Sequence, residues 1–171
     1  MRRLTLPLLL MTLFCLSCNS VQKQPIFYIS VHMPISSAEV VPSTLIMQVT
    51  DELTRESHYV RKIPLFSSAD IIDGEVVPSK NPTRCHLKLV IDSHTNAKLQ
   101  EALYYNKGVR ACMLVDGFIA GFTAFIPSED NTAIITKEAL WNPTEAQLIV
   151  DKIPHNNDIN GINSIRPWKK R

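Results

Sequence analysis

Side chains that could do acid–base or metal chemistry are thinly spread through this sequence. The histidines show no metal-ligand spacing, and they are His32, His58, His86, His94 and His155. Asp92 and His94 could form an acid–base pair, but Asp92 stands at a strand-to-helix junction, where a carboxylate caps the helix. The sequence has no G-x-S-x-G nucleophile motif. We therefore predict a protein that is not an enzyme and that has no metal or cofactor site.

The first eighteen residues have the layout of a cleaved secretory signal, with two arginines, a short apolar run and a small residue before Cys18. The apolar run, residues 4–16, is well under the ~20 residues that a transmembrane helix needs. A cysteine at the cut site resembles the bacterial lipoprotein signal, in which that cysteine carries the lipid. Such signals usually have leucine where this chain has Cys15. We expect lipid attachment at Cys18, with free secretion as the alternative.

Composition and charge favour a folded domain over a disordered or nucleic-acid-binding chain. Hydrophobic residues make up 45% of the sequence and charged residues 20%, as in globular proteins that bury a core. Without the two arginines of the signal, the 18 basic residues fall to 16 and equal the 16 acidic ones. A neutral mature chain has no general electrostatic attraction to nucleic acid, so no nucleic-acid partner is expected.

The two cysteines beyond the signal, Cys85 and Cys112, fall in predicted strands. In an oxidising envelope compartment they could form a disulfide, provided that their strands are adjacent and their Cα atoms lie within about 7 Å. Free cysteines usually behave as small buried hydrophobic residues instead. The sequence leaves both alternatives open, and neither cysteine has the CxxC spacing of a zinc site.

The rest of the chain alternates β-rich runs with two helical patterns. Extended segments are predicted at residues 26–32, 44–50, 57–63, 73–77, 85–92, 109–115, 118–125 and 132–136. The run 85–92 alternates most clearly and predicts one buried face, made of Cys85, Leu87, Leu89 and Ile91. Asp116 and Gly117 predict a type I′ hairpin turn, and Gly121 predicts a bulge in the next strand.

Two helices are predicted from their caps and apolar stripes. The first follows Asp92 or Ser93 and runs to about Tyr105. The second begins after Asn142 and ends at Pro154. A single helical turn is expected in the sequence SSADI that precedes the fourth extended segment. The order of elements predicts an α+β domain, with a mainly antiparallel sheet and two helices packed on one face.

Four segments of the second half, taken in order, carry a family resemblance: IPLFSSADIIDGEVV, CHLKLVIDSHTNAKLQEAL, NKGVRACMLVDGFI and AIITKEALWNPTEAQLIVDKI. The positions that mark it are Asn106, Gly108, Asp116, Gly117, Glu145, Ala146, Ile149 and Val150. Together these segments resemble the head subdomain of the first periplasmic region of SecD, an export-assisting membrane protein. The resemblance covers residues 63–153 and implies a SecD-head-like fold with a ferredoxin-like arrangement.

The resemblance implies a shape and a role rather than a site. The role attributed to the SecD head is transient contact with emerging or unfolded polypeptide. SecD also uses transmembrane helices to couple proton movement to export. This sequence predicts no transmembrane helix beyond the signal, so no proton-driven step is expected. A polypeptide-binding role would take the form of an extended peptide pairing with a free edge strand.

Two further groups of residues have alternative interpretations. The aromatic residues Tyr104, Tyr105, Phe118, Phe122 and Phe125 could form a peptide-contacting surface, or they could fill the core. The basic residues near the C-terminus could contact anionic lipid headgroups, or they could belong to a solvated, disordered chain end. Together with one tryptophan, they are Arg166, Trp168, Lys169, Lys170 and Arg171.

The sequence predicts a bacterial cell-envelope lipoprotein that faces the periplasm, with the outer membrane favoured by Asn19. Its expected parts are a signal peptide (1–17), a tether (18–25), an N-terminal β-rich segment (26–62), the SecD-head-like domain (63–153) and a flexible tail (154–171). The expected partners are the membrane, through the lipid, and a polypeptide or an envelope protein. The alternatives are a small envelope hydrolase on the same scaffold and an accessory structural subunit of an envelope complex.

Overall fold

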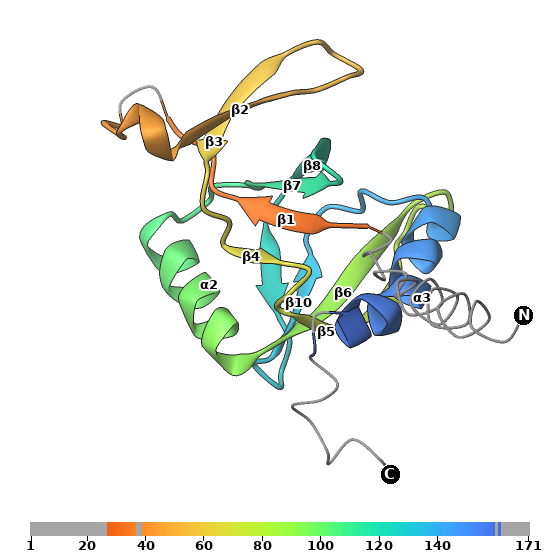
Figure 1. Cartoon of the computed structure of the whole chain (residues 1–171). Coiled ribbons are helices and arrows are strands. Elements are labelled where there is room, and N and C mark those ends of the chain that lie inside the picture. Colours follow the sequence, from red (N-terminus) through yellow and green to blue (C-terminus); the bar gives the residue numbers. More distant parts are fainter. Residues whose placement is uncertain (1–26, 37–38, 160, 162–171) are drawn as a thin grey trace, which may run out of the picture.

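The computed structural model describes residues 27–36, 39–159 and 161 (Figure 1). The predicted signal and tether, Cys18 and the basic C-terminal residues lie outside the described residues. The strands are β1 Ile29–His32, β2 Ile46–Thr50, β3 Ser57–Arg61, β4 Phe66–Ser67, β5 Ile71–Pro78, β6 Cys85–Ile91, β7 Ala111–Val115, β8 Phe118–Thr123, β9 Phe125–Pro127 and β10 Ala133–Thr136. The helices are α2 Ser93–Tyr105 and α3 Pro143–Ile159, with a 3₁₀ helix at Ser43–Leu45.

The predicted α+β class is confirmed, and the sheet is divided in two. One four-stranded sheet has the order β4-β1-β7-β8 and the other the order β5-β6-β10-β9, while β2 and β3 form a separate hairpin. The strand pairs are antiparallel. The two helices lie on different sides of the molecule in Figure 1, with α3 against β5 and β6. Both helices nevertheless contribute apolar side chains to one core cluster.

The alternation predicted for β6 is confirmed. Cys85, Leu87, Leu89 and Ile91 are all buried, and the residues between them are half-buried. These side chains form the centre of the main cluster, which both sheets and both helices share. The buried face of β6, which follows from its alternating sequence, therefore forms the surface against which the other elements pack.

The N-terminal segment is part of the same folded unit as the second half of the chain. β1 lies between β4 and β7, with Val31 opposite Phe66 on one side and opposite Met113 on the other. Ile29 and Val31 are fully buried in the main cluster. The expected boundary between residues 62 and 63 therefore does not separate two folded units.

The β7–β8 connection has the predicted geometry. Asp116 and Gly117 both have positive φ angles, of 52° and 87°, as a type I′ turn requires. The Asp116 carboxylate also accepts a hydrogen bond from the Tyr28 N–H at 2.6 Å, which ties the turn to the start of β1. The predicted bulge is present, because the register of the pair shifts next to Gly121, where φ is 154°.

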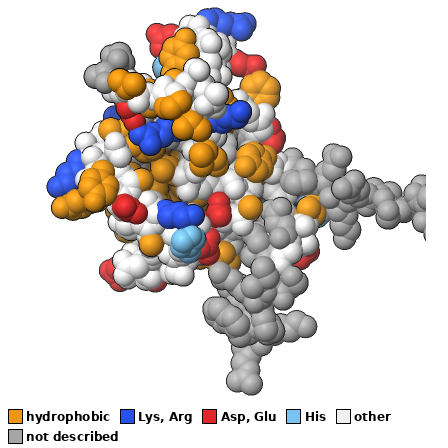
Figure 2. Space-filling view, turned by 60° about the vertical axis from the view of Figure 1, so that its left-hand side comes forward, with side chains coloured by type: hydrophobic (Ala, Val, Ile, Leu, Met, Phe, Trp, Pro, Cys, Tyr) orange, Lys and Arg blue, Asp and Glu red, His pale blue; other side chains and the backbone are white. Residues whose placement is uncertain are grey.

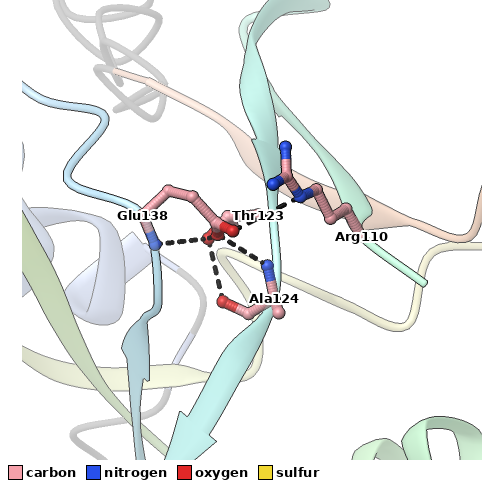
Figure 3. Close-up of polar contacts among 4 residues, drawn as sticks. All are labelled: Arg110, Thr123, Ala124 and Glu138. Carbon is pink, nitrogen blue, oxygen red and sulfur yellow. Dashed lines mark hydrogen bonds and ion pairs between the residues drawn. The ribbon is translucent and has the colours of Figure 1, made fainter. Parts of the chain in front are cut away.

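The predicted strand over residues 118–125 is not continuous, because the chain changes sheets at Ala124. Glu138 holds this point (Figure 3): its Oε2 accepts hydrogen bonds from the Thr123 hydroxyl at 2.7 Å and from the Ala124 N–H at 3.0 Å. Its Oε1 lies 3.3 Å from Arg110 Nε. Partial burial alone would raise the pKa of Glu138, but these hydrogen bonds and the Arg110 charge hold that pKa below its usual value.

Both helix N-termini are capped as predicted, and one predicted helix end is wrong. The Thr95 N–H donates to the Asp92 carboxylate at 3.0 Å, and the Thr144 N–H donates to Asn142 Oδ1 at 2.9 Å. However, α3 does not end at Pro154 but continues to Ile159.

Tertiary contacts explain why α3 passes its proline. Asn156 Nδ2 donates to the Phe27 carbonyl at 3.0 Å, and Asn157 Nδ2 donates to the Ile72 carbonyl at 2.6 Å. Both asparagines are buried. These bonds to distant segments offset the backbone bond that a proline removes from a helix interior.

The single helical turn expected at residues 67–71 is also wrong. Ser67 belongs to β4, and Ile71 begins β5. The residues between them form a tight turn, in which the Asp70 carboxylate accepts a hydrogen bond from the Ser67 N–H at 2.8 Å. An aspartate that bonds to the backbone nearby favours a turn over a helix.

Candidate functional site

A groove with a volume of about 610 Å³ runs along one side of α2. We call it the α2 groove. Its lining is Met33, Glu39, Val40, Val41, Pro42, Leu45, Arg61, Ile63, Pro64, Leu65, Lys98, Glu101, Ala102, Tyr105 and Asn106. Figure 2 presents the side of the molecule that carries α2, where hydrophobic side chains lie scattered with charged ones between them.

Backbone hydrogen bonds and one core side chain fix the walls of the groove. The Leu65 N–H donates to the Val31 carbonyl at 2.7 Å, which aligns the segment between β3 and β4 with β1. The Lys62 N–H donates to the Leu45 carbonyl at 2.8 Å, which closes the base of the hairpin. Leu99 is fully buried and anchors α2 to the main cluster.

The groove exposes more apolar surface than a folded chain needs to. Val40 is 99% exposed, Ile63 70% and Tyr105 76%. Single exposed apolar residues are ordinary, whereas several around one concave site are typical of a binding surface. The groove therefore has the apolar lining that a peptide or protein segment requires.

The charged groups of the groove balance one another. Arg61 forms an ion pair with Glu39, and α2 contributes Lys98 and Glu101. The lining thus holds two cationic and two anionic side chains. Such a site gives no electrostatic preference for a strongly charged ligand, so its chemistry suits an uncharged segment.

No side-chain hydrogen bond or ion pair joins Asp92 to His94 in the described structure. Partial burial alone would raise the pKa of Asp92, but hydrogen bonds from the Thr95 hydroxyl and the Thr95 N–H, together with the charge of His94, hold that pKa below its usual value. Asp92 therefore acts as a helix cap, as the sequence indicates. Among the described residues, no group of three or more His, Cys, Asp or Glu side chains is placed to hold a metal ion.

His32 is a buried histidine, an environment that the sequence did not indicate. It is 4% exposed, with Nδ1 2.8 Å from the Arg61 carbonyl and Nε2 2.9 Å from Ser30 Oγ. Burial lowers the pKa of His32, against the raising effect of the bond to Arg61. The signal for this environment is only the β-rich run around the residue, which does not distinguish a buried histidine from an exposed one.

Cys85 and Cys112 are free buried thiols rather than a disulfide. Cys85 lies in β6 and belongs to the main cluster, whereas Cys112 lies in β7 of the other sheet. Cys112 belongs to a second cluster beneath the β2–β3 hairpin. Burial raises the pKa of both thiols, that of Cys112 to about 11. They behave as small hydrophobic residues, which is the alternative that the sequence left open.

The aromatic residues divide between core and surface. Phe125 is buried in the main cluster, where its ring packs edge-on against Phe66. Tyr104 and Tyr105 are 67% and 76% exposed at the end of α2. Tyr105 lines the α2 groove, and both tyrosines line a second hollow of about 570 Å³ on the other side of the helix.

Sequence reasoning missed most of the groove. Its residues from 39–45 and 63–65 lie in irregular segments that show neither helical nor strand periodicity. A signal was present, since both segments place exposed aliphatic residues beside a proline. It could not be interpreted without knowing that the two segments meet on one side of a helix.

No family model matches this chain, and no curated protein matches it. The solved structures that resemble it include two of SecDF. The crystal structure of SecDF in its super-membrane-facing form has a TM-score of 0.50 and 15% identity, over 74% of this chain and 18% of that one. The structure of SecDF, described as a membrane component that enhances protein export, has a TM-score of 0.48 and 16% identity, over 78% of this chain and 63% of that one.

The first of these likenesses confirms the predicted resemblance at the level of fold. This is a likeness of fold alone. The match covers 74% of this chain, which is a larger share than residues 63–153 make up. The likeness in fold therefore extends beyond the segment that carried the sequence resemblance. This chain spans less than a fifth of the SecDF chain in that match. Among the described residues, no helix is long and apolar enough to cross a membrane.

Proposed function

We propose that this chain is a lipid-anchored envelope protein that binds unfolded or emerging polypeptide in the α2 groove without catalysing a reaction. The observation that carries the proposal is the groove itself, which is apolar, open and balanced in charge. The sequence resemblance to the SecD head and the likeness in fold to SecDF support it. A role linked to protein export follows as part of the same proposal.

The proposed occupant of the groove is an extended, largely uncharged chain segment. Its apolar side chains would contact Val40, Ile63 and Tyr105, which are already exposed in the free protein. Its backbone would lie between the proline-containing segments and α2. Binding would remove apolar surface from water at about 25 cal/mol per Å², without a charged partner.

Binding can be tested with an unfolded protein probe and one matched pair of variants. Ile63→Asp puts a carboxylate into the groove, and Leu148→Asp makes the same change at a 57% exposed leucine of α3, outside the groove. We expect Ile63→Asp to weaken the binding of reduced, carboxymethylated α-lactalbumin by at least tenfold, or about 1.4 kcal/mol. Leu148→Asp should leave the affinity unchanged. Equal effects of the two changes would contradict the proposal.

Anchoring is a separate part of the proposal and has its own test. Cys18→Ala removes the sulfur that would carry the lipid. We expect this variant to move from the membrane fraction to the soluble fraction of cells. An unchanged distribution would show that the anchor is not at Cys18, and it would leave the groove unaffected.

A further inference from the structure

The outer edge of β2 is unpaired in the described part of the chain. β2 pairs with β3 alone, and β3 in turn contacts the segment after β1 through the bond from the Arg61 N–H to the Met33 carbonyl. The hairpin therefore leaves β2 as the last strand on its side. An edge of this kind is a template on which another extended chain can pair.

The register shows which backbone groups point outward from β2. On either side of the paired residues, the Lys62 N–H donates to the Leu45 carbonyl at 2.8 Å and the Asp51 N–H donates to the Glu56 carbonyl at 2.9 Å. Because bonding alternates along an antiparallel strand, Met47 and Val49 also face β3, while Gln48 and Thr50 face away. The Ile46 N–H bonds to the Ser43 carbonyl. The free groups are thus the N–H and C=O of Gln48 and Thr50 and the C=O of Ile46.

An apolar cluster is incompletely covered beside this edge. Its buried members are Val49 on β2, Val60 on β3, and Cys112 and Leu114 on β7. Its partly buried members are Met47 on β2 and Ile119 and Phe122 on β8. Cα atoms of β2 and β8 come within 8 Å of each other, but no backbone pairing joins the two strands. The cluster is therefore open along the seam between β2 and β8.

The other edge strands carry features that oppose pairing. β4 has two residues, and β9 has three and ends in Pro127. β5 carries Asp73 and Glu75 and is packed against α3. β8 contains the bulge at Gly121. Short length, proline, charged side chains and bulges are the features that protect sheet edges from pairing. β2 has none of these features, and its sequence, IMQVT, contains no charged residue.

We propose that an extended segment of unfolded polypeptide adds to β2 as a further strand at this seam. Only another extended backbone offers the alternating donors and acceptors that Gln48 and Thr50 require. Its inward side chains are apolar, because they contact Met47, Ile119 and Phe122. The segment is uncharged, because neither β2 nor β8 carries a charge. This inference rests on the proposed function and gives the same unfolded chain a second contact, outside the α2 groove.

A proline at position 48 tests the backbone contact. Gln48→Pro removes an N–H that is not used in pairing with β3, so the hairpin keeps its internal bonds. Gln48→Thr changes the same side chain and keeps the N–H. We expect Gln48→Pro to weaken the binding of reduced, carboxymethylated α-lactalbumin to the full chain by about tenfold. Gln48→Thr should bind within twofold of the unsubstituted chain, and equal affinity of both variants would overturn the inference.

Residue-resolved hydrogen exchange of the unsubstituted chain tests the same contact without a variant. The Met47 and Val49 amides are paired already, so only the Gln48 and Thr50 amides should gain protection when the probe binds. Binding without that gain overturns the inference and leaves the α2 groove as the site. No binding by the unsubstituted chain overturns the proposed function as well. Protection that rises with protein concentration in the absence of the probe assigns the edge to a second copy of this chain and overturns the inference.

Discussion

The two sides of this molecule differ in how completely their helix is packed. α3 lies along β5, where Gly74 lets it come so close that a Cβ on Gly74 would be 2.6 Å from Ile153 Cδ1. Ile153 is 3% exposed, and Asn156 donates a hydrogen bond to the carbonyl of Phe27, just before β1. α3 is thus packed closely against the sheet, and we call this the closed side; its outer surface still has a hollow of about 390 Å³ that includes Leu148.

α2 is anchored mainly through one fully buried leucine, Leu99, and has a hollow on each side of its second half. Tyr104 and Tyr105 stand exposed between the two hollows. The β2–β3 hairpin on this side covers a small cluster that is open at one edge. We therefore place the proposed partner surface on the α2 side and expect the α3 side mainly to stabilise the fold.

The largest expected effect is on the closed side. Ile153→Ala removes most of a buried side chain between α3 and β5. We expect the free energy of unfolding to fall by about 2–5 kcal/mol, because a cavity remains where the sheet cannot relax. Urea titration measures this. Leu148→Ala, on the exposed face of the same helix, should change stability by less than about 0.5 kcal/mol.

A pair of asparagines compares the two sides directly. Asn156 donates from a buried position to a distant carbonyl, whereas Asn106 donates at 2.8 Å to Ala102 at the end of its own helix. Asn156→Ala should cost about 1–3 kcal/mol of unfolding free energy, because it leaves a buried carbonyl unpaired. Asn106→Ala should lower the free energy of unfolding by clearly less. Equal losses of unfolding free energy in the two variants would contradict the distinction between the α2 and α3 sides.

His32 joins the two regions, because it lies in β1 and contacts the carbonyl of Arg61 at the groove. Its lowered pKa means that the folded protein binds a proton less readily than the unfolded chain. The contribution of His32 to stability is therefore complete above the unfolded pKa of about 6.5, and it is lost as pH falls from there through the lower pKa of the folded state. Chemical unfolding at several pH values should show this decline, and His32→Asn should flatten it over the same range.

The smallest effect on stability is expected at the end of α2. Tyr105→Ala removes a ring that is 76% exposed, so the free energy of unfolding should change by less than about 0.5 kcal/mol. The same change should weaken the binding of an unfolded protein, because Tyr105 lines the α2 groove. Titration calorimetry and urea unfolding of one variant separate the two effects. A large loss of stability would place Tyr105 among the packing residues.

The sequence predicted local features on both sides of the molecule and few of the contacts between distant segments. The alternation of β6, the Asp116-Gly117 turn and the caps at Asp92 and Asn142 are local patterns, and each is confirmed. The end of α3 was wrong because Asn156 is held by a contact that is distant in sequence. Three further features depend on contacts between segments that are distant in sequence: the position of β1, the change of sheets at Ala124 and the α2 groove. A single sequence contains no periodic pattern or residue spacing that predicts such contacts.

The central claim is that unfolded polypeptide contacts the α2 side and not the α3 side. Photo-crosslinking from the purified full chain tests it directly, with a benzophenone side chain at position 105 in one variant and at position 148 in the other. Both positions are exposed, at Tyr105 and Leu148. The account predicts crosslinks to reduced, carboxymethylated α-lactalbumin from position 105 and none above background from position 148. Equal crosslinking from both positions, or crosslinking from position 148 alone, would contradict it.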